Sequence, residues 1–359
     1  MFTDNNIKRI GFACKWSEIN HKQQMVSTEG LNTGTTTLTW LRNNPDLAEQ
    51  KMWDIMERNL TNTYNLVSKV ATLPQSLRMV RLTSDMLCGY SHPEFAYFYK
   101  QTDVRNRMEQ LCAPIGEVAR TNNVRLSFHP GQFTVLASAS EGIVNNSITE
   151  FEYHVDMARA MGYGRSFQDF KINVHISGKK GPQGIIDVLP RLSPEARNTI
   201  TIENDEMSWG LDASLELADH LALVLDIHHH WVKDGEYILP TDDRCKRIID
   251  SWRGVRPVIH YSVSREDCLV GHNADELPQL DTLLESGYKK AKLRAHSDYY
   301  PNQIVNDWAL SFLPYTDIMC ESKCKNLASI DLYKYKEELK HYELFKHNVQ
   351  QQEPELENA

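Results

Sequence analysis

Residues 221–230 read LALVLDIHHH, and this stretch decides how the rest of the chain is interpreted. Every position from Leu221 to Leu225 is apolar, so both faces of the segment have to be covered by other parts of the protein. A strand of this kind is typical of a parallel sheet that lies between other layers. Asp226 and three histidines follow directly. The stretch therefore predicts a buried parallel strand with polar chemistry at its carboxyl end.

Seven other short apolar segments recur along the chain, which gives eight predicted strands. They lie at 7–14, 77–83, 124–129, 170–176, 199–203, 221–228, 257–262 and 317–321. Between the strands, apolar residues repeat at the spacing of one helix face, as in residues 49–71. Strands that alternate with helices indicate βαβ units and a parallel sheet. Eight such units favour an α/β fold of the (β/α)8, or TIM, barrel type over an open sheet.

The chain is interpreted as one domain with two additions. No low-complexity linker divides residues 1–330, so a single barrel domain is the simplest organisation. Residues 265–311 form a long polar insertion between the seventh and eighth strands. Residues 331–359 are expected to be a charged helix and a tail, QQEPELENA, that frays.

The composition excludes several classes of protein. The 359 residues carry 39 Lys and Arg against 48 Asp and Glu, a net charge of −9, which argues weakly against broad coating of nucleic acid. No apolar run approaches the roughly 18 residues of a membrane span. The start, MFTDNNIKRI, lacks a secretory signal, and seven scattered cysteines fit reduced thiols, so a cytoplasmic protein is expected. The 14 histidines are the unusual feature of the composition.

Histidines and carboxylates gather where the predicted strands end. In a (β/α)8 barrel the carboxyl ends of the strands form one rim, which carries the active site. A single histidine there is more often structural than a ligand, but six successive strands favour a metal site for Zn, Mn or Fe. Strand alternation is expected to turn His229 to one face and its two neighbours to the other. The predicted ring consists of His129, His175, Glu203, Asp226, His229, His260 and Glu321.

Gln132 and Phe133 follow a Pro-Gly turn after His129. The turn is tight and rigid, so it could project both side chains outward from the rim. An aromatic side chain on such a turn can wedge between bases, and an amide can occupy a vacated base position. The alternative of a buried phenylalanine and a solvated glutamine is equally open.

Six motifs in this order closely resemble the UV damage endonucleases: HPGQ (129–132), NVHISG (173–178), IEND (202–205), DIHHH (226–230), RPVIHYS (256–262) and ESK (321–323). The resemblance covers roughly residues 7–325 and includes the segments 81–85 and 91–93. It implies a barrel related to endonuclease IV and an enzyme that nicks double-stranded DNA immediately 5′ to pyrimidine dimers, 6-4 photoproducts or abasic sites. The cut leaves a 3′-hydroxyl and a 5′-phosphate and opens an ATP-independent excision pathway. A monomer without membrane contact, cytoplasmic and associated with the nucleoid, is expected.

The resemblance also implies a set of two to three divalent metal ions, with Mn²⁺ expected first and Zn²⁺, Co²⁺ or Mg²⁺ as alternatives. One ion would take His129, His175 and a bridging Glu203. The central ion would take Glu203, Asp226, His260 and Glu321, and the three carboxylates would be catalytic. A third ion would take His229 and a histidine of the insertion. Gln132 and Phe133 would fill the gap left by a damaged dinucleotide flipped out of the duplex.

Three departures from the family pattern affect these assignments. In the long insertion His296 and His272 compete for the third ion, and the surrounding sequence favours His296. Val258 stands where family members carry a lysine, which makes the third site the least secure. Phe12 and Phe133 stand where the family usually has tyrosine, so stacking is kept and a hydroxyl is lost.

Basic residues near the strand ends are candidates for phosphate contacts, although a solvated surface is the more common role of such runs. They are Lys179 and Lys180 after the fourth strand, and Lys289, Lys290, Lys292 and Arg294 in the insertion.

Two other classes of protein remain open. Sugar isomerases of this barrel group use two metal ions to polarise a polyol, but they have no need of HPGQ. A damage sensor could keep the fold without the chemistry, although the intact carboxylates favour an enzyme.

Overall fold

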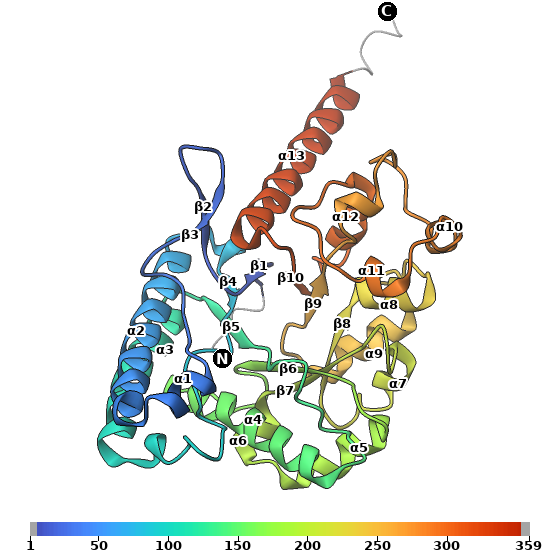
Figure 1. Ribbon diagram of the computed structural model, residues 1–359. Helices are drawn as coiled ribbons and strands as arrows, with labels where there is room; N and C mark the ends of the chain where they lie inside the picture. The colour runs from blue at the N-terminus through green and yellow to red at the C-terminus, as the bar shows by residue number, and fades with distance from the viewer. Residues whose placement is uncertain (1–5, 353–359) are drawn as a thin grey trace, which may run out of the picture.

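The computed structural model describes residues 6–352, with side chains described for residues 6–340. Eight parallel strands close into a barrel in the order β1-β10-β9-β8-β7-β6-β5-β4, which confirms the predicted (β/α)8 class (Figure 1). Each strand lies within its predicted segment. The strands are β1 (Ile10–Ala13), β4 (Met79–Arg81), β5 (Arg125–Phe128), β6 (Lys171–His175), β7 (Ile200–Glu203), β8 (Ala222–Asp226), β9 (Val258–Tyr261) and β10 (Asp317–Cys320).

Helices and short 3-10 turns connect the strands and surround the barrel (Figure 1). The helices are α1 (Leu38–Asn43), α2 (Pro45–Ala71), α3 (Thr102–Thr121), α4 (Glu141–Ala160), α5 (Gly181–Val188), α6 (Pro194–Thr199), α7 (Leu211–Leu215), α8 (Ile227–Asp234), α9 (Asp243–Ser251), α10 (Leu280–Glu285), α11 (Lys290–Leu293), α12 (Gln303–Leu310) and α13 (Lys325–Gln352). The 3-10 turns are η1 (Gln75–Leu77), η2 (Phe98–Lys100), η3 (Leu189–Arg191) and η4 (Glu266–Cys268).

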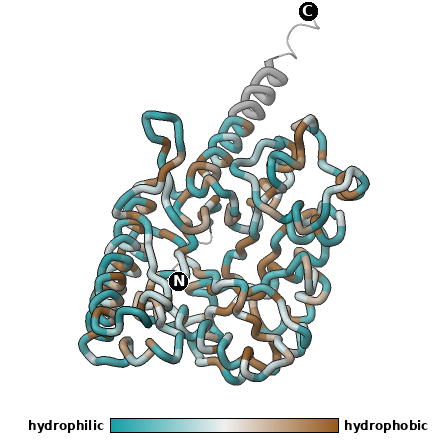
Figure 2. The backbone as a smooth tube through the Cα atoms, in the orientation of Figure 1, coloured by the Kyte–Doolittle hydropathy of each residue, from teal (hydrophilic) through white to brown (hydrophobic). Residues whose placement is uncertain are grey.

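The register of the barrel brings polar residues to the same level. His175 pairs with Glu203 across β6 and β7, and Asp226 pairs with His260 across β8 and β9. Below this level the strands are buried and mostly apolar, with polar exceptions such as Lys171. In Figure 2 brown segments are frequent inside the barrel, while the tip of the hairpin formed by residues 17–27 is teal. The alternation of apolar core and polar rim therefore follows from the sequence and the register together.

Residues 228–230 are helical, which corrects the predicted continuation of the sixth strand. Strand β8 ends at Asp226, whose side chain accepts a hydrogen bond from the backbone N–H of His229 at 2.7 Å and caps α8. Such a cap starts a helix at the next residue. The three histidines therefore diverge by helical rotation and not by strand alternation.

Three further features differ from the sequence prediction or extend it. A two-stranded antiparallel hairpin, β2 (Ser17–Ile19) and β3 (Met25–Ser27), follows β1 and was not predicted. The insertion 265–311 contains η4 and helices α10 to α12. Helix α13 begins before the predicted boundary at residue 331, and most of the tail expected to fray, 353–359, lies outside the described residues. Among the described helices, none combines the length and apolar character that crossing a bilayer requires.

Gly178 allows two rim loops to pack closely. Its φ is +102°, and a Cβ there would lie 2.4 Å from the carbonyl group of Ala137. The loop after β6 therefore rests directly on the loop that contains HPGQ, and only glycine fits at the contact.

Asp317 anchors the opposite end of the barrel, at the start of β10. Its carboxylate accepts hydrogen bonds from the Arg9 backbone at 2.9 Å, from Arg125 Nη1 at 2.8 Å and from Arg256 Nε at 2.8 Å. All four residues are at least largely buried. Other guanidinium nitrogens of these arginines donate to backbone carbonyls, and Arg9 Nη1 donates to that of Ile7. One carboxylate thus ties together the segments that begin β1, β5, β9 and β10.

Asp317→Asn should destabilise the protein by about 3–5 kcal/mol, because it leaves buried arginines without a compensating charge. Urea denaturation and thermal melting measure the change. The matched control is Asp250→Asn, which removes an exposed carboxylate paired with Lys246 at 2.6 Å and should leave the stability almost unchanged. Equal stability of the two variants would contradict the anchoring role.

Candidate metal centre at the barrel rim

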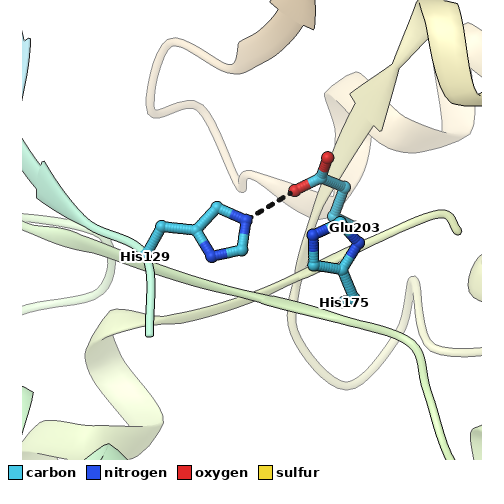
Figure 3. Close-up of side chains that lie close together, drawn as sticks. All are labelled: His129, His175 and Glu203. Carbon is cyan, nitrogen blue, oxygen red and sulfur yellow. Dashed lines mark ion pairs between the residues drawn. The ribbon is translucent and has the colours of Figure 1, made fainter. Parts of the chain in front are cut away.

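Glu203, the last residue of β7, lies at the centre of the rim cluster and is fully buried. Its Oε2 atom lies 3.3 Å from His129 Nε2, and its Oε1 atom lies 3.2 Å from His260 Nδ1 and 3.4 Å from His229 Nδ1. Figure 3 shows His129 pointing toward this carboxylate, with the ring of His175 close by. Three imidazoles therefore approach a single carboxylate, from the loop after β5, from α8 and from β9, and His175 at the end of β6 lies beside it.

Asn173 fixes the orientation of Glu203. Its amide donates to Glu203 Oε2, while its own carbonyl oxygen accepts from the Thr201 hydroxyl at 2.8 Å. All three side chains are buried. This role was not predicted from the sequence, although Asn173 stands two residues before His175 and so points to the same face of β6.

The ligand atoms form two groups that share Glu203. One group consists of His129, His175 and Glu203, and the other of Glu203, Asp226 and His260; within each group the ligand atoms lie within 4.8 Å of one another. Glu321 Oε1 lies 3.3 Å from His260 Nδ1 and is also paired with Arg81. The structure thus brings together the residues predicted for the first two metal ions.

Several buried atoms of these groups have no hydrogen-bond partner within the described part of the chain. They are His175 Nδ1, Glu203 Oε1, Asp226 Oδ2 and His260 Nδ1. Buried polar atoms are normally satisfied, because leaving them unpaired is costly. Imidazole nitrogens and carboxylate oxygens that converge without partners are the donor set of a Zn, Mn or Fe site. The residues present therefore fit divalent metal ions.

Backbone carbonyls select which ring nitrogen faces the cluster. His129 Nδ1 lies 3.0 Å from the carbonyl oxygen of Pro130, and His229 Nδ1 lies 3.1 Å from that of Asn204. A carbonyl can only accept, so each Nδ1 carries a proton, and Nε2 keeps a lone pair whenever the ring is neutral. Metal-binding histidines are oriented by the same kind of contact.

The charges of the cluster are strongly coupled. Burial alone would raise the pKa of the Glu203 carboxyl, but His260, His175 and His129 hold it well below its usual range. Burial raises the pKa of Asp226, and Glu203 and Glu321 raise it further. Burial opposes protonation of His229, but its acidic neighbours, led by Asp226, raise its pKa to about 10. A protonated His229 therefore balances carboxylates that a metal ion would otherwise neutralise.

Lys171 is a buried amine that the sequence analysis did not identify. Its Nζ atom lies 2.9 Å from His260 Nε2, and burial lowers its pKa to about 7. Burial also lowers the pKa of His260 to about 4. Val258, where the family pattern has lysine, is buried in an apolar cluster that includes Trp252. The amine that contacts His260 therefore belongs to Lys171 on β6, and position 258 on β9 supplies none.

The environment of the third predicted ion contains His229, Glu206 and His296. His229 Nε2 lies 3.6 Å from Glu206 Oε2, and Arg294 donates to Glu206 at 2.9 Å. The backbone of His296 pairs with that of Ser264 in an isolated antiparallel β-bridge. Burial lowers the pKa of His296, Glu321 raises it, and His229 lowers it.

The remaining candidate histidines have local partners. His272 Nδ1 contacts the carbonyl oxygen of its neighbour Asn273 at 2.7 Å. His228 Nε2 contacts the carbonyl oxygen of Leu293 at 3.1 Å, and His230 pairs with Glu236 at 2.9 Å. Neither His228 nor His230 approaches Glu203 as His229 does, so His229 is the member of the triplet that faces the cluster.

The predicted DNA-contacting residues differ in their surroundings. Phe133 is 84% exposed and Gln132 is exposed beside it, whereas Phe12 is buried against Trp16 with ring centroids 5.8 Å apart. Lys179 and Lys180 are exposed after β6. In the insertion Lys289 is also exposed, but the other three basic residues have partners in the protein. Lys290 donates to the Lys233 carbonyl, Lys292 pairs with Asp267 at 3.1 Å, and Arg294 binds Glu206.

The fold and the rim cluster define a class, the (β/α)8 barrels that carry a His- and carboxylate-rich centre at the strand ends. The crystal structure of endonuclease IV from Thermus thermophilus shares the barrel, with a TM-score of 0.50 and 12% identity over 77% of this chain and 94% of that one. The crystal structure of SacUVDE matches with a TM-score of 0.67 and 23% identity over 92% of this chain and 99% of that one.

The family model of UV-endonuclease UvdE matches residues 8–354, and the chain belongs to this family. Curated relatives are consistent with it. A UV DNA damage endonuclease of Bacillus mycoides (strain KBAB4) is 25% identical over 89% of this chain and 93% of its own length. A UV DNA damage endonuclease of Bacillus cereus (strain Q1) is 26% identical over 79% of this chain and 82% of its own length.

The raised pKa of His229 predicts that metal affinity depends on pH. A cation can bind Nε2 only after the ring loses its proton, so affinity should rise as the pH approaches about 10, with protons released to the buffer. Calorimetric titrations in two buffers of different ionisation enthalpy count these protons. With a chelator present, the same raised pKa adds stability below the unfolded value of about 6.5, and this stability is lost as the pH rises through about 10.

His229→Asn should remove this proton release, and the matched variant His220→Asn, at an exposed surface histidine, should retain it. Identical binding enthalpies of the wild-type protein in both buffers would show that no ring is deprotonated on binding.

Proposed function

We propose that this protein is a metal-dependent DNA repair endonuclease. It nicks double-stranded DNA on the 5′ side of pyrimidine dimers and 6-4 photoproducts, with abasic sites as further substrates, and leaves a 3′-hydroxyl and a 5′-phosphate. The observation that carries this proposal is the buried Glu203 carboxylate shared by two groups of ligand atoms, in a chain that belongs to the UV-endonuclease family. Such incision would open an ATP-independent excision pathway.

Divalent ions would be held as the two groups and their neighbours suggest. His129, His175 and Glu203 would hold one ion, and Glu203, Asp226, His260 and Glu321 a second. His229 and His296 would hold a third. Mn²⁺ is the proposed native ion, with Zn²⁺, Co²⁺ and Mg²⁺ as substitutes. When bound, the ions supply electrophilic stabilisation of the phosphate and make hydrolysis by water possible at neutral pH.

The carboxylates around the ligand groups would move the proton. Asp226 uses Oδ1 to cap α8, and its Oδ2 has no hydrogen-bond partner among the described residues. Burial raises the pKa of this carboxyl in the metal-free site, and with an ion bound the carboxylate would orient the attacking water or accept its proton. Glu321, fixed by Arg81 on one side, would orient the same water.

Phe133 and Gln132 would recognise the lesion. An exposed phenyl ring is costly to leave in water, and here it projects from the loop directly after the ligand His129. Inserted into the duplex, the ring would stack in the gap left by a flipped dinucleotide, and the amide of Gln132 would face the opposite bases. The protein is proposed to act as a monomer on nucleoid DNA in the cytoplasm.

Glu203→Gln should leave the barrel folded and abolish nicking. The neutral amide keeps the shape of the side chain but removes the charge that both ion sites share. The assay compares irradiated with intact supercoiled plasmid, each with Mn²⁺ and with EDTA. Wild-type protein should nick only irradiated plasmid and only with metal, and the control Glu285→Gln, at an exposed site of the insertion, should match it.

Full activity of Glu203→Gln would exclude the shared ligand. Binding to irradiated plasmid without any nicking by the wild-type protein would instead indicate a damage sensor.

The double variant Gln132→Ala, Phe133→Ala should keep its metal content but lose discrimination between damaged and intact duplex. Stacking on a base contributes about 1–3 kcal/mol, so the preference should fall roughly 5- to 150-fold. Competition binding with dimer-containing and intact duplexes measures it. Val270→Ala removes another strongly exposed apolar side chain, 85% exposed on the insertion, and should change nothing. Undiminished discrimination by the double variant would disprove the wedge.

A further inference from the structure

Three residues that are not glycine hold a left-handed backbone at one corner of the rim. Strand β1 ends at Ala13, and the next two residues, Cys14 and Lys15, have φ values of +44° and +49°. Lys325, the first residue of α13, has a φ of +53°. Lysine rarely adopts this conformation, and strained backbone of this kind gathers at functional sites.

The two strained segments are fastened to each other. The backbone N–H of Ser17 donates to Asn326 Oδ1 at 2.8 Å, and Asn326 Nδ2 donates to the Ser17 carbonyl at 3.0 Å, both in buried positions. Lys15 and Lys325 closely flank this double contact in the sequence. In Figure 1 the first turn of α13 lies beside β1, at the base of the hairpin β2–β3. The backbone therefore holds two lysines at one corner despite their charges.

Arg81 adds a third cation to the same corner. It ends β4, the neighbour of β1, and its carbonyl oxygen accepts from the Cys14 N–H at 2.8 Å. Its guanidinium is paired with Glu321. Within residues 6–340, whose side chains the structure describes, the ammonium groups of Lys15 and Lys325 form no ion pair or hydrogen bond. The cationic groups of Lys15, Lys325 and Arg81 thus lie near a single carboxylate, that of Glu321. The corner therefore has an excess of positive charge.

Electrostatic contacts agree with this geometry. Burial lowers the pKa of Lys325, Arg81 and Lys15 lower it further, and Cys14 and Glu321 oppose this shift without reversing it. Cations held together in this way repel one another until an anion arrives. The strained backbone and the unpaired ammonium groups of the two lysines both lower the stability of the fold. A bound anion would compensate for this cost, because it would neutralise the lysines.

We propose that Lys15 and Lys325, with Arg81 behind them, bind a phosphate of the DNA backbone. The inference rests on the proposed function and adds a binding subsite to it. This corner lies at β1 and β10, whereas Lys179 and Lys180 follow β6, on the far side of the closed barrel. The Glu203 cluster lies between the two sides, so a duplex placed across the rim would contact both.

The salt dependence of DNA binding tests the subsite. Binding of the full-length protein to a short intact duplex is followed by fluorescence anisotropy in Mn²⁺ over a series of KCl concentrations. Each phosphate contact contributes about 0.9 to the slope of log affinity against log salt. Lys15→Asn with Lys325→Asn removes one such contact and should reduce the slope by about 1. Asparagine tolerates the left-handed backbone, so the melting temperature should stay the same or rise.

Two matched variants complete the design. Lys15→Arg with Lys325→Arg should keep the wild-type slope, because the charge is retained. Lys100→Asn with Lys246→Asn changes the net charge equally at exposed outer positions and should also keep it. A slope that is unchanged in the Lys15 and Lys325 double variant would overturn the subsite. So would loss of inorganic phosphate binding in that variant, seen by calorimetry, without any change in the DNA slope.

Failure of the proposed function is a separate result. If the wild-type protein neither binds the duplex nor nicks irradiated plasmid, the endonuclease proposal fails and the subsite fails with it. If the wild-type protein does both and the Lys15 and Lys325 double variant shows the same salt slope, the subsite alone is wrong.

Discussion

The geometry of the rim depends on burying one carboxylate, that of Glu203. A buried charge is tolerated only when partners compensate for it. Here Asn173 donates to one oxygen, and His129, His229 and His260 surround the rest of the group. The partners come from different elements of the barrel, so the barrel has to close in the observed register before the charge is compensated. The arrangement of the ligand atoms at the rim therefore depends on the same strand register that closes the barrel.

The buried charged groups at the two ends of the barrel differ in how completely they are hydrogen-bonded. At the amino-terminal end, both oxygens of Asp317 accept hydrogen bonds from arginine groups. At the carboxyl-terminal end, Asp226 Oδ2 and His260 Nδ1 have no hydrogen-bond partner in the described part of the chain. A buried carboxylate whose oxygens are both hydrogen-bonded stabilises a fold, whereas converging oxygen and nitrogen atoms without hydrogen bonds are typical of a site that binds a cation. The difference between the two ends agrees with the general rule that the active sites of these barrels lie at the strand carboxyl ends.

The barrel and most of the rim cluster could be predicted because both follow from local patterns. Apolar runs such as 221–225 indicate strands, and the barrel fold brings their carboxyl ends together regardless of the length and conformation of the loops. The helical course of His228 to His230 could not be predicted from alternation, because it depends on the Asp226 side chain capping the chain. The contacts of Lys171 and Arg81 were also missed, since their partners lie far away in sequence and no local spacing marks them.

A crystal structure of the protein grown with Mn²⁺, with anomalous diffraction recorded at the manganese edge, would show whether metal ions share the Glu203 carboxylate. We expect at least two anomalous peaks at the rim that share the Glu203 carboxylate, one beside His129 and His175 and one beside Asp226 and His260. Manganese peaks at other sites only, or an intact rim with no peak beside Glu203, would contradict it.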